Sequence, residues 1–74
     1  MKNIFLDMPN NKLSQALEEY EEWAFDTGLI RKEGILAGAR NKYKESGLDI
    51  HIMERDLLYA GAKRWHNTYK EGKV

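Results

Sequence analysis

Three glycines divide this chain into segments, and they constrain its fold more than any other feature. Gly28, Gly47 and Gly72 each follow a stretch in which apolar residues recur at helical spacing. A glycine at that place is typical of the left-handed residue that ends an α-helix. The sequence therefore predicts an all-α fold with three helices, at about residues 11–27, 29–46 and 49–71.

The three predicted helices differ in how regular they are. The first carries one apolar stripe, made of Leu13, Ala16, Leu17, Tyr20, Trp23 and Ala24. The second contains Gly34 and Gly38, each of which costs about 1 kcal/mol relative to alanine inside a helix. Either this helix begins late, or its glycines admit the close approach of another backbone. At the start of the third, Leu48, Asp49 and Met53 fit a hydrophobic staple around an Asp N-cap.

The first nine residues have a different character from the rest. Ile4, Phe5 and Leu6 are adjacent apolar residues, and Pro9 follows them. Because a residue before proline favours extended backbone, residues 1–9 are expected to form a short extended arm. This arm would pack across the helices or onto a second chain, and a single strand is one form that it could take.

The small size of the chain favours self-association. Its 74 residues form one domain, 1–74, and a chain of this length buries only about 60–65% of its unfolded surface. With no cysteine there is no disulfide to add stability, so oligomerisation is the usual remedy. The eight aromatic residues supply the side chains that interfaces favour. We expect a homodimer.

Several functional classes lack their sequence signals here. No uninterrupted apolar run exceeds four residues, far short of the ~20 needed to span a bilayer, so a cytoplasmic location is expected. Only two histidines, His51 and His66, are present, with no third ligand at a metal-binding spacing. Neither a nucleophile elbow nor a phosphate-binding glycine loop is found. We therefore expect no enzyme, no metal and no cofactor.

Charge is distributed unevenly along the chain, although its formal sum is zero. The first 28 residues carry six acids and two bases, whereas the remaining 46 carry ten bases and six acids. This predicts an electrically polar surface, and such surfaces commonly meet a charged partner.

The acids gather on one face of the first predicted helix. They lie opposite the apolar stripe, with Phe25 projecting among them, and they are Glu18, Glu19, Glu21, Glu22 and Asp26. Like charges four residues apart each destabilise a helix by about 0.2–0.5 kcal/mol. One interpretation is a solvated face with Phe25 covered by a neighbouring helix. The other is a binding surface for a basic partner, in which Glu18, Glu19, Glu22, Phe25 and Asp26 make the contacts and the carboxylates imitate a row of phosphates.

A second charged row lies on the third predicted helix. Steps of four, four, three and four residues put a basic and aromatic set on one face: Arg55, Tyr59, Lys63, His66 and Lys70. Arg40, Lys42 and Lys44 could extend it. Basic residues between aromatics can contact phosphates and stack on bases. The alternative function is therefore a small DNA- or RNA-binding regulatory protein, and a third is an assembly subunit that only self-associates.

In its size, its composition and its acidic helix, the chain resembles small phage-encoded host-takeover proteins. That resemblance implies a protein–protein interaction module that binds and inhibits or modulates a host protein of the replication or transcription machinery, in the host cytoplasm. Host-takeover proteins of this kind include inhibitors of the DNA sliding clamp, some of which act as DNA mimics. The chain has no clamp-binding peptide of the Gln-x-x-Leu-x-Phe type, because Glu18 stands three residues after Gln15. An inhibitor of that kind would have to fill the positively charged channel instead.

Overall fold

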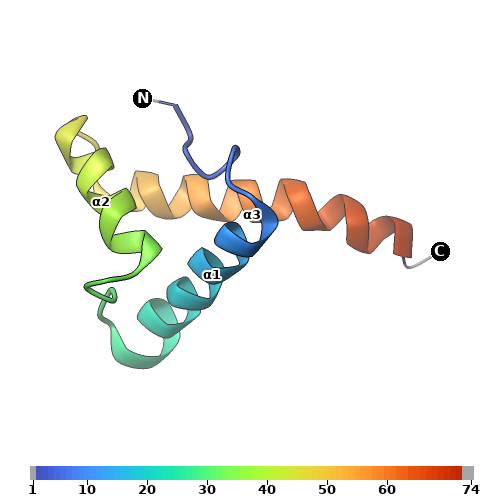
Figure 1. Ribbon diagram of the computed structural model, residues 1–74, viewed down its shortest axis with the longest axis horizontal. Helices are drawn as coiled ribbons and strands as arrows, with labels where there is room; N and C mark the ends of the chain where they lie inside the picture. The colour runs from blue at the N-terminus through green and yellow to red at the C-terminus, as the bar shows by residue number, and fades with distance from the viewer. Residues whose placement is uncertain (1, 73–74) are drawn as a thin grey trace.

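The described part of the chain is all-α, as predicted. The computed structural model describes the backbone of residues 2–72 and the side chains of residues 2–66, and this part contains three helices and no strand. Helix α1 spans Asn10–Glu21 and continues directly into η1, a π-helical segment at Glu22–Thr27. Helix α2 spans Ile35–Glu45, and α3 spans Ile50–Gly72 (Figure 1).

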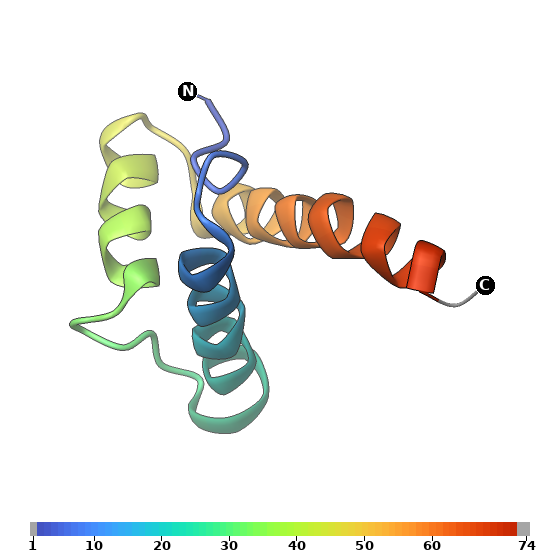
Figure 2. The same ribbon diagram turned by 45° about the vertical axis from the view of Figure 1, so that its right-hand side comes forward.

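The core lies where the three helices meet under the N-terminal segment. Its fully buried members come from every element except η1: Phe5, Leu13, Ala16, Leu36, Ala39, Tyr43, Met53, Leu57 and Ala60. Helix α1 packs against both α2 and α3. The last turns of α3 extend past the other elements (Figures 1 and 2). No helix in the described part is both long and apolar enough to cross a membrane.

The N-terminal segment folds back on itself instead of running extended. Residues 4–7 form a turn, in which the Asn3 side chain accepts a hydrogen bond from the Phe5 amide at 3.0 Å. The turn puts Phe5 into the core, where its ring stacks on Tyr43 at a centroid distance of 6.2 Å. The expected extended conformation is therefore wrong for residues 4–7, which form a turn while Phe5 is buried in the core.

Two of the predicted helix ends are confirmed. Gly28 ends η1 with φ of 73°, and Gly47 follows α2 with φ of 78°, so both take the left-handed conformation that favours glycine. Asp49 caps α3, since its Oδ1 accepts hydrogen bonds from the amides of His51 and Ile52 at 2.9 and 3.2 Å. Gly72 is the last residue assigned to α3.

The second helix begins six residues later than predicted. Gly34 is its N-cap, with φ of −88° and ψ of 178°, and residues 28–34 form a connection. Leu29 lies in that connection and is 72% exposed, whereas Leu36 and Tyr43 are buried in the core. A glycine N-cap has no side chain with which to bind the first amides of the helix, so those amides need a partner from elsewhere.

Candidate functional site

The partner of these α2 amides is Glu19, one of the residues predicted to face an external partner. Its carboxylate accepts hydrogen bonds from the amides of Ile35 at 3.2 Å and Leu36 at 3.1 Å. Gln15 donates a third at 3.1 Å. Glu19 is only 4% exposed, so the prediction that it belongs to an open acidic face is wrong. The positive end of the α2 dipole and two unsatisfied amides hold the carboxylate inside the fold.

Gly34 is what makes room for that carboxylate. A Cβ added to Gly34 would lie 2.2 Å from Oε1 of Glu19, and its three nearest atoms would all belong to this carboxylate. The first interpretation of the glycines therefore holds, because the helix begins late. The second, the close approach of another backbone, is wrong: a side chain from α1 approaches Gly34, and nothing lies within 4 Å of a Cβ added to Gly38.

A second predicted partner-binding acid is engaged within the molecule. Glu22 accepts two hydrogen bonds from the Arg31 guanidinium, at 2.9 Å from Nε and 2.7 Å from Nη2. These bonds lower the pKa of Glu22 below its ordinary value. Glu22, which the sequence assigned to an external basic partner, thus pairs within the molecule, because the late start of α2 leaves Arg31 in a connection that can fold back beside η1.

The remaining predicted residues form an open surface at the end of α1. Glu18, Glu21 and Asp26 are exposed and make no ion pair with any described side chain. Phe25, which the sequence placed among these acids, is 77% exposed and uncovered by a helix. Leu29, at 72% exposed, follows Phe25 by four residues. We call this set, Glu18, Glu21, Phe25, Asp26 and Leu29, the acidic-aromatic surface.

Tyr20 connects this surface to the rest of the fold. Its hydroxyl donates a 2.8 Å hydrogen bond to the Glu54 carboxylate of α3, and this bond raises the pKa of the Tyr20 hydroxyl above its ordinary value. The rings of Trp23 and Phe25 meet the Tyr20 ring edge-on, at centroid distances of 5.5 and 6.3 Å. Such contacts restrict where the Phe25 ring can lie. Segments of π-helix such as η1 also occur often at functional sites.

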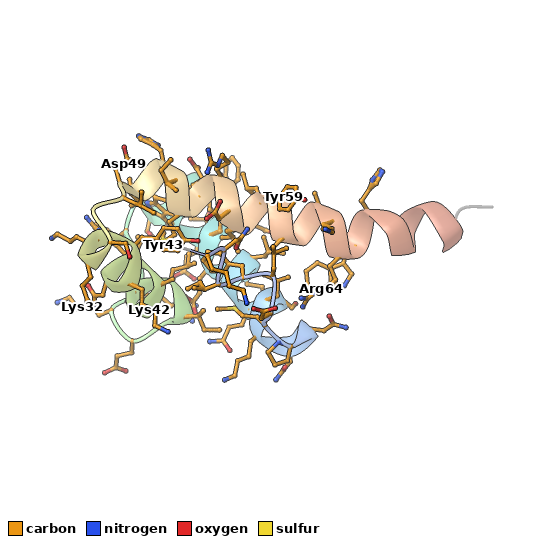
Figure 3. All side chains as sticks on the ribbon, turned by 90° about the horizontal axis from the view of Figure 1, so that it is seen from above. Lys32, Lys42, Tyr43, Asp49, Tyr59 and Arg64 are labelled. Atoms are coloured by element: carbon orange, nitrogen blue, oxygen red, sulfur yellow. The ribbon has the colours of Figure 1, made fainter. Side chains whose placement is uncertain are left out.

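The basic row of α3 is exposed, but some of its side chains already contact a neighbour within the molecule. Arg55, Tyr59, Lys63 and His66 are exposed, and the Lys63 ammonium lies 5.8 Å from the centre of the Tyr59 ring. Arg55 lies 3.6 Å from its neighbour Asp56. The side chain of Lys70, the last member of the row, lies outside the described residues. Figure 3 shows Tyr59 and Arg64 on different sides of α3, so Arg64 does not join the row.

No group of three or more His, Asp or Glu side chains within residues 2–66 is arranged to hold a metal ion. Tyr43 is the most perturbed group; burial, with a 2.6 Å hydrogen bond to Asp56, raises the pKa of its hydroxyl strongly. Because that hydroxyl remains protonated and lies against the core, we assign it a structural role.

Comparisons with protein-family models, with curated proteins and with solved structures find no match to this chain.

Proposed function

We propose that this chain is a helical protein–protein interaction module that binds a basic, nucleic-acid-handling protein through its acidic-aromatic surface. The supporting observation is Phe25, an aromatic ring 77% exposed, in a segment whose carboxylates Glu18, Glu21 and Asp26 are exposed and form no ion pair with a described side chain. Exposing such a ring forgoes roughly 1.5–3 kcal/mol of burial, which a partner would supply. Central aromatic anchors within a charged rim are typical of interface hot spots.

The mode of binding differs from a plain imitation of phosphates. With Glu19 capping α2 and Glu22 paired with Arg31, three carboxylates remain available, at Glu18, Glu21 and Asp26. We infer that they steer a cationic surface into place, while Phe25 supplies most of the contact area. Inhibition or modulation would follow if this contact covered the partner's nucleic-acid site. The resemblance to phage host-takeover proteins makes the replicative sliding clamp one candidate, because its channel accommodates DNA.

Charge reversal with a matched control tests the proposal. In capture from a bacterial lysate, and with purified sliding clamp, Glu18→Lys/Glu21→Lys should lose the partner. Glu33→Lys/Glu45→Lys changes the net charge equally at exposed sites elsewhere and should retain it. Phe25→Ala should weaken binding about tenfold or more. Raising salt to 0.5 M should also weaken it, since screening then acts over about 4 Å.

If both double variants retain the partner equally, the acidic-aromatic surface does not bind it. The second candidate, nucleic-acid binding by α3, is favoured by the exposed Tyr59–Lys63 pair. It predicts that Lys63→Glu abolishes function, while Glu18→Lys/Glu21→Lys leaves it intact or improves it.

A further inference from the structure

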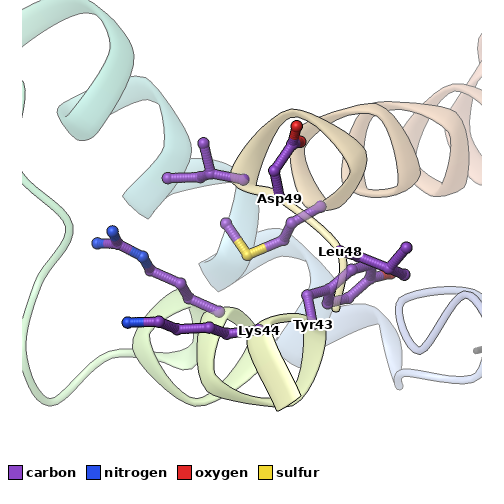
Figure 4. A pocket seen from close by; sticks show the side chains of 7 residues that line it. Tyr43, Lys44, Leu48 and Asp49 are labelled. Carbon is purple, nitrogen blue, oxygen red and sulfur yellow. The ribbon is translucent and has the colours of Figure 1, made fainter. Parts of the chain in front are cut away.

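A pocket with basic residues at its edge lies where α2 ends and α3 begins. It has a volume of about 230 Å³ and is lined mainly by apolar groups, including Leu48, Ile50 and Met53. Arg40 and Lys44 contribute the cations. Figure 4 shows Lys44 along one side of the pocket, opposite Leu48 and Tyr43.

The lining of this pocket carries a net positive charge, because two cations, Arg40 and Lys44, outnumber the single carboxylate of Asp49. Arg40 and Lys44 are four residues apart, so they share one face of α2, and neither pairs with an acid among the described side chains. The one carboxylate of the lining, Asp49, is engaged by the first amides of α3. Arg40 and Lys44 also border a neighbouring hollow that includes Lys32. A ligand that fits must present an apolar group with carboxylates beside it.

The size of the pocket suits a single ring. A cavity of about 150 Å³ is enough to hold benzene, so this volume accommodates one phenyl group with space to spare. The chain itself displays such a group: Phe25 is the most exposed large apolar side chain of the described part, and Glu21 and Asp26 lie on the same surface. The Phe25 ring therefore fits the pocket in size, and Glu21 and Asp26 are opposite in charge to the cations of the pocket.

One molecule cannot join its own two surfaces. The acidic-aromatic surface lies at the end of η1, before the connection that leads into α2, whereas the pocket lies at the opposite end of α2 (Figure 1). The 11 residues of α2 separate these ends by about 16 Å. Phe25 can therefore reach such a pocket only on another molecule.

We propose that the pocket receives Phe25 of a second copy of this chain, with Glu21 and Asp26 of one copy facing Arg40 and Lys44 of the other. If both copies make the contact at once, the assembly closes as a two-fold dimer. This contact covers the surface assigned above to an external partner, so self-association and partner binding exclude each other. The self-association does not depend on what that partner is.

Sedimentation of the full chain at about 50 mM salt tests this. The wild type should show a mass above that of the monomer, while Phe25→Ala should raise the dissociation constant about tenfold or more. Arg40→Glu/Lys44→Glu should be monomeric. Lys12→Glu/Lys42→Glu is the control, with equal charge change at exposed residues outside the pocket, and it should still associate. Circular dichroism checks that each variant is folded.

A mixing experiment isolates the contact. Glu21→Lys/Asp26→Lys should also be monomeric, because its acidic-aromatic surface and its pocket are then both positive. In Arg40→Glu/Lys44→Glu, the acidic-aromatic surface and the pocket are both negative. An equimolar mixture should associate one to one, since each reversed surface then meets its complement. A wild type that stays monomeric at 1 mM, or a mixture that stays monomeric, overturns the inference. Association that is insensitive to Arg40, Lys44 and Phe25 overturns it too.

The outcomes separate this inference from the proposed function. Arg40→Glu/Lys44→Glu leaves the acidic-aromatic surface intact, so it should capture the external partner at least as well as the wild type. Loss of self-association with partner capture retained supports both proposals. A monomeric wild type that captures the partner overturns only the self-association.

Discussion

The contact between Glu19 and Gly34 allows a sharp test of how this fold is stabilised. Glu19→Ala removes two charge-assisted hydrogen bonds to the α2 amides, each worth about 1.5–3 kcal/mol. Water will satisfy part of this loss, so we expect a destabilisation of about 2–4 kcal/mol. That is a large share of the roughly 4–11 kcal/mol expected for 74 residues. Glu19→Gln keeps the shape and an acceptor, and should cost about 1–2 kcal/mol.

Gly34→Ala should also break the hydrogen bonds between Glu19 and the α2 amides, because it displaces the carboxylate. The new methyl group would lie 2.2 Å from Oε1 of Glu19, so the carboxylate must move and lose its bonds to α2. We expect a cost of about 2–3 kcal/mol in the wild type. In the Glu19→Ala background the obstructing group is gone, and the φ of −88° suits alanine. There, Gly34→Ala should change stability by less than about 0.5 kcal/mol.

Urea unfolding followed by circular dichroism measures this double-mutant cycle. We expect a coupling of about 2 kcal/mol between the two positions, within the range for residues in direct contact. Gly38→Ala is the control, since nothing lies within 4 Å of its added Cβ, and its effect should be the same in both backgrounds. Costs for Gly34→Ala and Glu19→Ala that simply add would refute the assignment of Glu19 as the cap of α2.

Three further predictions concern single side chains. Gly38→Ala should stabilise the protein by about 0.5–1 kcal/mol and raise Tm by several degrees, because Gly38 lies in open space inside α2; an unchanged or lower Tm contradicts this. The free energy of unfolding should fall above pH 10 by up to about 1.4 kcal/mol per pH unit, because the raised pKa of Tyr43 keeps its hydroxyl protonated only in the folded state. In Tyr43→Phe that part of the alkaline slope should disappear, as urea titrations at pH 9–11 can show. Tyr20→Phe should cost about 1 kcal/mol by removing the bond to Glu54 and should broaden the NMR signals of the Phe25 ring; sharp, unshifted signals would deny Tyr20 its positioning role.

Local signals in the sequence predicted most of the fold. Gly28 and Gly47 adopt the left-handed conformation expected of helix-ending glycines, and Asp49 is the predicted cap. Each of these features depends on residues within one or two turns of chain. The start of α2 was wrong by six residues because its cap, Glu19, comes from 15 positions before Gly34, beyond the reach of local patterns.

The exposure of the candidate site's residues was predicted in part, for a related reason. Glu18, Phe25 and Asp26 are exposed, whereas Glu19 is buried, because helical spacing cannot tell an exposed face from one that a neighbouring helix end covers. Glu19 and Glu22 look alike in the sequence as members of an acidic run, yet one caps α2 and the other pairs with Arg31. The sequence held one signal for this contact. A helix that begins after a glycine has no side chain at its N-cap, so its first amides need a hydrogen-bond acceptor from elsewhere in the chain.

Arg64 of α3 holds the N-terminal segment in place, so this segment can make its final contacts only after α3 has been synthesised. Its guanidinium donates hydrogen bonds to the carbonyls of Leu6, at 2.7 Å, and Met8, while Asn3 bonds the Asp56 carbonyl of the same helix. During synthesis, residues 3–8 are made more than fifty residues before Arg64, so these hydrogen bonds can form only after most of α3 has been made. Translation that stalls before α3 therefore leaves the N-terminal segment without the contacts that hold it over the core.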